Sequence, residues 1–298
     1  CSIEKLRKAV SLTERITGKN LTLPILSTIL IIAKDKNITL RSTNLSIGIQ
    51  VDVPSKIEEE GVICVQGSVL NGILNNILGD ELLTLSTKGD VLNILTKQNK
   101  VNLKLYPHED FPTLPVVEGV SLNISTQKMI EGIKSVYYSA TVSDIKPEIA
   151  SVYIYPQDDN IIFVATDSFR LAEKKVKVKN IPEFPPILIP YKNIIEIMRV
   201  YDGVNDDIEI ILSKNQCSFI SQNTYLTSRL VDGAFPDYRQ IIPKTSKTQA
   251  IILKNDLLNT LKLSTVIADK FNQITLTMNV KEKRCEKKKT NSDIGDQN

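Results

Sequence analysis

Side chains that could do acid–base and nucleophilic chemistry stand together in VATDSFRLAEKK, which runs from Val164 to Lys175. The stretch follows an apolar run and contains an acid, a hydroxyl, an aromatic ring and a guanidinium. Such a group of side chains can belong to an active site, to a ligand site or to a turn. A nucleophile such as Ser168 needs a neighbouring base, most often histidine. The single histidine, His108, belongs to a distant part of the chain, which disfavours a Ser–His–Asp triad.

The remaining residue types also give little support for an enzyme. His108 is followed by Glu109 and Asp110, and three adjacent residues are poorly spaced for metal ligands. The stretch TGKN, Thr17–Asn20, lacks the first glycine of a phosphate-binding loop and the Ser or Thr after its lysine. We therefore expect no catalytic activity, no cofactor and no metal.

Cysteine usage and hydropathy indicate the compartment. Cys1, Cys64, Cys217 and Cys285 show neither metal-ligand spacing nor a disulfide framework, which fits a reducing cytosol. Charged residues interrupt the N-terminal segment, and the most apolar window, Leu21–Ala33, is too short to span a bilayer. We expect a cytoplasmic protein without a secretory signal or a membrane span.

The net charge of the chain is too small to attract nucleic acid by itself. The chain has 37 Lys and Arg against 34 Asp and Glu, a formal net charge of +3. Much of this excess lies in residues 280–298, and the remainder is close to neutral. Contact with nucleic acid must therefore come from local placement of Lys and Arg rather than from a global field.

An internal repeat is the most informative feature of the sequence. TLPILSTILIIAKDKNITLRSTNLSIGI (Thr22–Ile49) can be laid over KPEIASVYIYPQDDNIIFVATDSFRLA (Lys146–Ala172). At a spacing of 123 residues the matched pairs are Pro24 and Pro147, Leu40 and Phe163, Thr43 and Thr166, and Asn44 and Asp167. Further on, EDFPTLP (Glu109–Pro115) corresponds to GAFPDYRQIIP (Gly233–Pro243). A period this long predicts tandem domains of one fold rather than a solenoid.

Each repeat begins with an amphipathic helix. Apolar residues at helical spacing predict helices over Ile3–Ile16, Thr126–Ala140 and Lys254–Lys270. The first has six residues on its apolar face: Ile3, Leu6, Ala9, Val10, Thr13 and Ile16. The outward faces carry basic residues: Lys5, Lys8, Arg15, Lys128, Lys134, Lys254, Lys262 and Lys270. Alternating strands, a second helix and a Phe-Pro motif complete each repeat.

These elements predict an α+β fold of tandem domains, each with two helices packed on antiparallel sheets. We expect domain one over residues 1–118, domain two over 119–244 and an incomplete domain three over 245–298. Domain three should hold its first helix and one strand, Asn272–Asn279. Residues 280–298 have no apolar period, so we expect a charged, disordered tail there.

The stretch around Asp167 fits a turn that carries a binding surface. Asn or Asp at the end of a strand can bond the backbone two residues on and reverse the chain, and Asn44 stands at the same place in the first repeat. The turn does not explain Phe169 and Arg170, because a ring and a guanidinium beside apolar residues are typical of binding hot spots. We interpret the stretch as part of a partner-binding groove.

On these motifs the sequence resembles the bacterial sliding clamp family, the β subunit of DNA polymerase III. The motifs are TLPILSTIL, STNLSIGI, DFPTLP, VATDSFRLA, IPYKNIIEIMR and SRLVDGAFPDYRQIIPK. The last of them and the A-T-D-S-x-R-L-A pattern are very specific. The resemblance covers the chain from Ile3 to Met278.

The resemblance implies a ring of DNA-clamp domains, three per subunit and two subunits per homodimer, with helices lining a hole for duplex DNA. Such a clamp has no catalytic activity and is a processivity factor, which tethers the replicative DNA polymerase to its template. The implied partners are duplex DNA without sequence preference, the DNA polymerase III catalytic subunit, the clamp loader, and other clamp-binding polymerases and repair proteins.

The resemblance also implies site residues. The family's peptide groove matches seven residues here: Ile149, Thr166, Ser168, Phe169, Arg170, Leu171 and Pro243. The family often has His at the position of Phe169. It places a DNA-touching arginine just before the L-P-I-L motif, where this chain has Asn20 beside Lys19. Lys146 and Lys192 are further DNA-facing candidates.

The third repeat departs from the family. The period predicts a third domain that runs to about residue 365, whereas the sequence has 298 residues. We expect a C-terminally truncated or divergent third domain, and the sequence leaves open a fragment, a frameshifted product or a degenerate clamp. The alternative function is a truncated non-ring clamp that acts as a peptide-binding interaction module.

Overall fold

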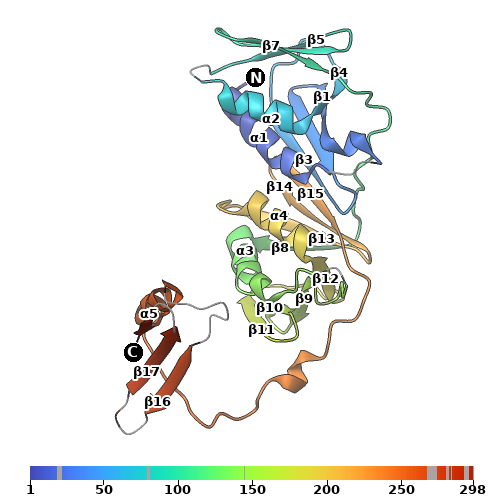
Figure 1. Cartoon of the computed structure of the whole chain (residues 1–298). Coiled ribbons are helices and arrows are strands. Elements are labelled where there is room, and N and C mark those ends of the chain that lie inside the picture. The colour runs from blue at the N-terminus through green and yellow to red at the C-terminus, as the bar shows by residue number, and fades with distance from the viewer. Residues whose placement is uncertain are drawn as a thin grey trace. The chain divides into compact units, whose positions relative to one another are not determined.

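The computed structural model describes residues 1–18, 22–78, 81–143, 145–266, 274–279, 282, 284–291 and 295–297. The chain forms two compact units, Cys1–Pro236 and Asp237–Asn298 (Figure 1). Among the described residues, no helix combines the length and the apolar character that crossing a bilayer requires.

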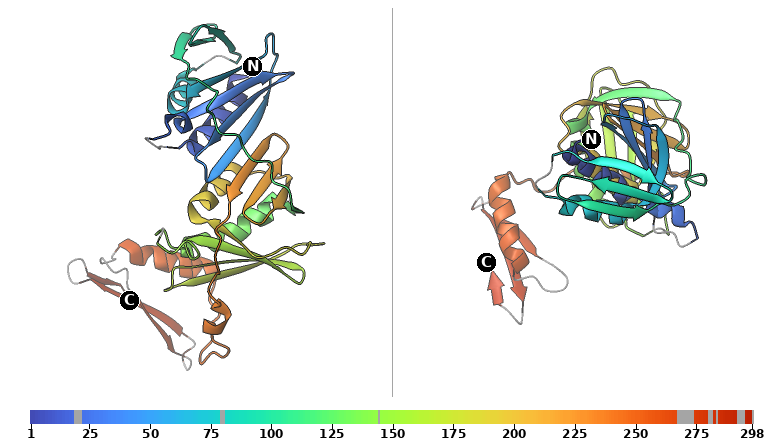
Figure 2. Two further views of the ribbon diagram at one scale, coloured as in Figure 1. Left: turned by 90° about the vertical axis from the view of Figure 1, so that its right-hand side faces the viewer. Right: turned by 90° about the horizontal axis from the view of Figure 1, so that it is seen from above.

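The first repeat folds in the predicted order. Its helices are α1 (Ile3–Ile16) and α2 (Gly67–Asn76). Its strands are β1 (Thr28–Lys34), β2 (Asn37–Thr43), β3 (Ile47–Pro54), β4 (Gly61–Gln66), β5 (Thr84–Lys88), β6 (Val91–Leu95) and β7 (Lys100–Lys104). The first four strands pair in the order β4-β1-β2-β3, and the last three form the separate sheet β5-β6-β7 (Figure 2).

The second repeat has the same elements, preceded by one more strand. Its helices are α3 (Thr126–Lys134) and α4 (Tyr191–Tyr201). Its strands are β8 (Val120–Ser125), β9 (Ser151–Gln157), β10 (Asn160–Thr166), β11 (Leu171–Lys177), β12 (Ile187–Pro190), β13 (Asp207–Leu212), β14 (Gln216–Ser221) and β15 (Thr224–Arg229). The sheet order β11-β10-β9-β12 mirrors β3-β2-β1-β4.

Strand registers repeat as well as strand order. Thr43 pairs with Gly48 between β2 and β3, and Thr166 pairs with Leu171 between β10 and β11, which is a shift of 123 for both partners. All pairings among the described strands of the two repeats are antiparallel. The prediction of tandem α+β domains is therefore confirmed.

One strand pair joins the two repeats. β3 lies antiparallel to β15, with Ile47–Val51 opposite Thr224–Ser228, and the resulting sheet has the order β4-β1-β2-β3-β15-β14-β13-β8. β11 and β7, the repeat counterparts of β3 and β15, each end a sheet instead.

The helices follow one another as a layer, α2–α1–α4–α3, in which each helix contacts the next (Figure 1). We call this the helix layer. α1 packs on β1, β2 and β3, and α3 packs on β8, β10 and β11. The buried residues of α1 are the six that its apolar spacing predicts. Burying each of the Leu, Ile and Val side chains in this face contributes about 1.5–3 kcal/mol.

The second unit contains α5 (Lys254–Val266), β16 (Thr275–Asn279), β17 (Arg284–Asn291) and β18 (Gly295–Gln297). The expectation of a disordered tail differs from this structure, because β17 pairs with β16. One buried position of β17 is Lys287, whose ammonium donates to Ser264 Oγ and to the Thr260 carbonyl. A lysine with a long aliphatic stem takes the place of an apolar residue, so the apolar alternation of a strand is missing. Ile267 and Lys270 of the predicted helix lie outside the described residues.

The helix predicted over Thr126–Ala140 is shorter in the structure. α3 ends at Lys134, and a 3₁₀ turn, Tyr137–Ser139, follows. β-branched and aromatic residues favour a helix only weakly, and the Tyr137 ring stacks on Tyr191 at 6.4 Å between centroids. Apolar spacing alone therefore did not extend the helix past Lys134.

Candidate functional site

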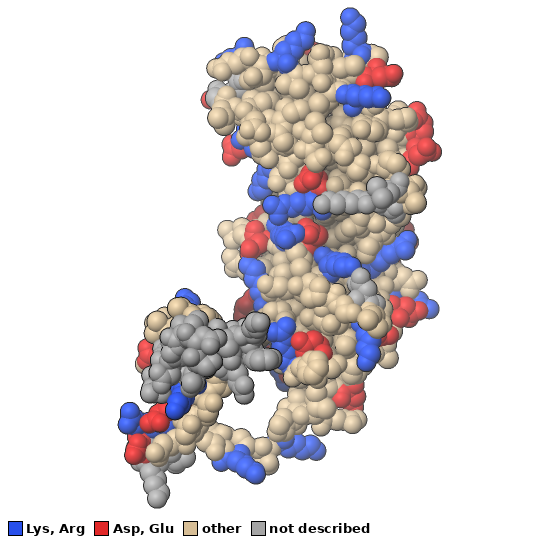
Figure 3. Space-filling view, in the orientation of Figure 1, with Lys and Arg blue, Asp and Glu red and all other residues tan. Residues whose placement is uncertain are grey.

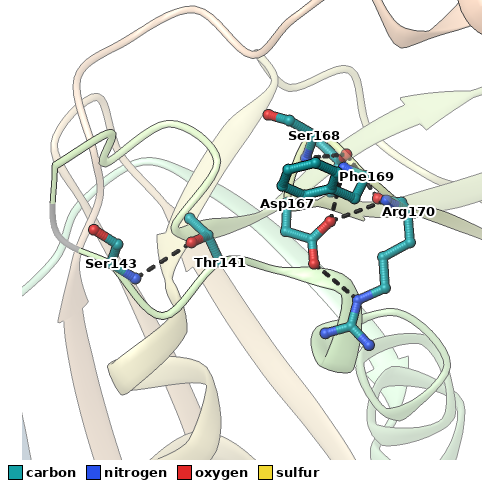
Figure 4. Close-up of polar contacts among 7 residues, drawn as sticks. Thr141, Ser143, Asp167, Ser168, Phe169 and Arg170 are labelled. Atoms are coloured by element: carbon teal, nitrogen blue, oxygen red, sulfur yellow. Dashed lines mark hydrogen bonds and ion pairs between the residues drawn. The ribbon is translucent and has the colours of Figure 1, made fainter. Parts of the chain in front are cut away.

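The turn after β10 is shaped by the side chains at its start. Asp167 Oδ1 accepts hydrogen bonds from the backbone N–H of Phe169 at 3.0 Å and of Arg170 at 2.9 Å (Figure 4). Asp167 Oδ2 accepts from Arg170 Nε at 2.9 Å, and the Thr166 hydroxyl donates to the Arg170 carbonyl at 2.8 Å. Ser168 has a φ of 75°, the left-handed conformation with which this turn reverses the chain.

The first repeat contains the same turn after β2. Asn44 Oδ1 accepts from the N–H groups of Ser46 and Ile47, both at 3.0 Å, and Thr43 Oγ1 donates to the Ile47 carbonyl at 3.0 Å. Leu45 has a φ of 73°. The Asn44 amide and the Asp167 carboxylate each accept hydrogen bonds from two backbone N–H groups. Because a neutral amide makes the same contacts, those of Asp167 are explained by the shape of the turn.

The charge state of Asp167 follows from these contacts. Burial raises the pKa of its carboxyl, but the N–H groups of Arg170 and Phe169 and the Arg170 guanidinium lower the pKa by more, to below its usual value. At neutral pH Asp167 is an ionised acceptor engaged in a turn, and a general base poised near neutral pH needs the opposite shift.

The predicted groove residues lie in both units. Six of the seven belong to the first unit: Ile149, Thr166, Ser168, Phe169, Arg170 and Leu171. Phe169 is 98% exposed, whereas Ile149 and Thr166 are buried. Pro243 belongs to the second unit and is exposed. The turn therefore presents a ring and a guanidinium to solvent at the end of β10.

Other reactive groups are poorly placed for catalysis. Within the described ranges, no three His, Cys, Asp or Glu side chains gather as metal ligands would. Burial raises the pKa of the Cys64 thiol to about 11 and raises that of Cys217 further. Both remain thiols at neutral pH, and the thiolate is the nucleophilic form.

Basic side chains are distributed over the helix layer (Figure 3). The predicted outward residues of α1 and α3 are all exposed: Lys5, Lys8, Arg15, Lys128 and Lys134. Lys146 and Lys192 are exposed too, Lys192 in the first turn of α4. Lys19 and Asn20, the other two predicted DNA-facing residues, lie outside the described residues.

Acidic side chains pair with some of these basic groups. Lys134 Nζ lies 2.8 Å from Asp202 Oδ1, and Arg199 Nη1 lies 2.6 Å from Glu196 Oε1. Burial raises the pKa of the Glu196 carboxyl, and the positive charges of Arg199 and Arg15 act in the opposite direction. The helix layer is thus a surface of mixed charge.

Asn193 is a structural residue that the sequence reasoning missed. It is 2% exposed, and its Nδ2 donates to the Ser46 carbonyl at 3.2 Å and to Ser228 Oγ at 2.8 Å. It therefore ties α4 to the turn of the first repeat. The sequence contained one signal of this role: a polar amide stands among the apolar residues of the α4 segment, at the position where α2 has Val69.

The chain is similar to known proteins over most of its length. The beta sliding clamp of Rickettsia felis is 29% identical over 281 residues, which are 92% of this chain and 74% of the relative. The crystal structure of the DNA polymerase III beta subunit of Thermotoga maritima has a TM-score of 0.87 and 25% identity, covering 99% of this chain and 80% of that chain. The sliding clamp of Bartonella birtlesii bound to griselimycin has a TM-score of 0.89 and 25% identity, covering 99% and 81%.

Two domain models of one family also match. The N-terminal domain of the DNA polymerase III beta subunit matches residues 1–115, and the central domain of the same subunit matches residues 123–237. The repeated fold, the shared turn and these matches agree. The chain belongs to the family of bacterial DNA polymerase III beta subunits, the beta sliding clamps.

Proposed function

We propose that this sliding clamp is a non-catalytic processivity factor of the cytoplasm, along whose helix layer duplex DNA slides while the clamp tethers the replicative polymerase. The observation that carries the proposal is the helix layer itself, in which helices of two domains present exposed Lys and Arg among acidic residues. Phosphate contacts hold DNA without reading its sequence. Interspersed acids keep such a hold weak, as sliding requires.

The turn at Asp167 supports a docking role. Phe169 and Arg170 are exposed side by side, and rings and guanidinium groups are enriched among binding hot spots. We infer that short peptides of the DNA polymerase III catalytic subunit, the clamp loader, other polymerases and repair proteins dock here. Buried Ile149 and half-buried Leu171 would form the floor of this groove.

Sheet edges support assembly into a ring. The pairing of β3 with β15 shows how two domains of this fold join. β7 and β11 are the repeat counterparts of those strands and end their sheets, and unpaired edges are templates for pairing. We infer a homodimeric ring with domains over 1–118, 119–244 and 245–298. The family matches, 1–115 and 123–237, fall within the first two.

Duplex binding over a salt series tests the proposal. Replacing Lys5, Lys8 and Lys134 together with alanine should flatten the slope of log Kd against log salt by about 0.9 for each phosphate that is no longer neutralised. Tight binding at high salt, or discrimination between sequences, would contradict a sliding clamp. The mass of the protein in solution separates a ring of two chains from a monomeric peptide-binding module.

A further inference from the structure

Two acidic residues of the α4 region lie against basic side chains of the helix layer. The first is Glu196, whose Oε1 is 2.6 Å from Arg199 Nη1 on the same helix. The Glu196 side chain is 18% exposed and the Arg199 side chain is 50% exposed. The carboxylate is therefore set into the layer, and the guanidinium that it neutralises reaches solvent.

Glu196 also interacts with a charge from the other domain. α1 and α4 are in contact, and Arg15 stands in the last turn of α1. Burial raises the pKa of the Glu196 carboxyl, and the charges of Arg199 and Arg15 oppose this rise. One carboxylate thus acts on two guanidinium groups of the candidate DNA-facing surface.

The second acidic residue is Asp202, which pairs with Lys134 of α3 at 2.8 Å. Asp202 is the C-cap residue of α4, where the helix dipole disfavours a negative charge. Setting a carboxylate such as Glu196 into the protein also disfavours its charged form. Glu196 and Arg199 form an (i,i+3) pair that stabilises α4 slightly, whereas helix stability does not account for Asp202.

Sliding gives both acids a physical role. DNA affinity increases with the number of phosphates that Lys and Arg neutralise, and an acid already paired with a basic group competes with phosphate for it. We propose that Glu196 and Asp202 are internal counter-ions of the helix layer, which keep its hold on duplex DNA weak enough for sliding. They are positioning residues that act through Arg15, Arg199 and Lys134. The inference rests on the proposed function, because DNA must pass along the helix layer.

The test measures binding of a fluorescent duplex to the full chain by anisotropy, between about 50 and 200 mM salt. Glu196→Gln and Asp202→Asn should each steepen the slope of log Kd against log salt by about 0.9 for each additional phosphate that the protein neutralises. The affinity ratio between the two salt concentrations then grows about threefold for each such phosphate. Adding Arg199→Ala to Glu196→Gln should remove most of the increase in slope, because that increase depends largely on the Arg199 guanidinium.

Glu58→Gln is the matched control. Glu58 lies 2.8 Å from Lys56 in an exposed segment between β3 and β4, so the variant changes the net charge equally but away from α4. It should leave the slope unchanged. A change as large as that of Glu196→Gln would assign the effect to net charge and overturn the inference. Thermal unfolding checks that each variant is folded. If Glu196→Gln does not fold, the slope measured for Asp202→Asn alone tests the inference.

Lys8→Ala separates this inference from the proposed function. If the wild-type protein binds DNA and Lys8→Ala weakens that binding, while Glu196→Gln and Asp202→Asn bind as the wild type does, the inference is wrong and the function stands. If the wild-type protein shows no salt-dependent binding at all, the proposed function fails and the inference fails with it.

Discussion

The turns at Asn44 and Asp167 have the same hydrogen bonds to the backbone and different surroundings. In the first repeat, Ser46 is half-buried against the second domain: its Oγ lies 3.3 Å from Asn193 Oδ1, and its carbonyl accepts from Arg229 N–H at 2.8 Å. The matching residue of the second repeat is Phe169, which is 98% exposed. One turn therefore closes a domain junction, and the other presents a ring to solvent.

The difference shows that shape and function are separable in this motif. The Asx contacts and the positive φ set the backbone in both repeats, and neither depends on what lies outside the turn. What each turn presents follows from the side chain at the third position and from what lies against it. An acid, a hydroxyl and an arginine in sequence are therefore weak evidence for catalysis when the acid is already bonded to its own backbone.

The largest effect is expected in peptide binding at the exposed turn. Phe169→Ser, which installs the residue of the first repeat, and Arg170→Ala should each weaken binding of a short apolar–acidic peptide by about tenfold or more, because removing a hot-spot side chain costs about 2 kcal/mol. Fluorescence titration measures it. Ser46→Ala is the control and should bind normally. Unchanged affinity in both turn variants would remove the docking interpretation.

The next effect concerns the covered turn. Asn193→Ala removes the hydrogen bonds of this buried amide with Ser46 and Ser228, each of which contributes about 0.5–1.5 kcal/mol net, so about 1–3 kcal/mol is lost in all. Denaturant unfolding should show a loss of that size. Val69→Ala, at the matching exposed position of α2, should cost far less. Equal losses in the two variants would mean that the contacts of Asn193 do not stabilise the junction between the two domains.

A smaller effect tests the claim that both turns are structural. Asp167→Ala and Asn44→Ala should each lower the free energy of unfolding by about 1 kcal/mol, because each removes the acceptor of two backbone N–H groups. Denaturant midpoints measure both. A loss for Asn44→Ala alone would show that Asp167 is kept for another reason.

The smallest effect is a pH dependence that distinguishes the two turns. The folded pKa of Asp167 is lowered, so its contribution is present above the unfolded pKa of about 3.9 and is lost as the pH falls through the folded value. We expect Asp167→Asn to cost about 0.5 kcal/mol or less at pH 7, and nothing at acid pH. Asn44→Asp should introduce a weaker dependence of the same sign into the first turn, because Ile47 stands there in place of Arg170. Unfolding at several pH values measures both.

Much of the fold was predictable because its signals are local. The six apolar positions of α1 match its buried face, and the spacing of 123 between Asn44 and Asp167 matches the strand registers around them. Predictions based on apolar spacing alone differ from the structure in two places. α3 ends at Lys134 although apolar spacing continues to Ala140, and β17 forms around Lys287 without an apolar period.

The sequence by itself determined the repeat, the helix faces and the turn, because helical periodicity and Asx contacts depend on residues close together in the chain. Only the tertiary structure decided which turn is covered, which residue holds the junction and which acids neutralise the helix layer. Asn193 meets Ser46, and Glu196 acts on Arg15, across a domain boundary. Contacts between segments so distant in sequence depend on how whole domains pack, and no local pattern of residues records that packing.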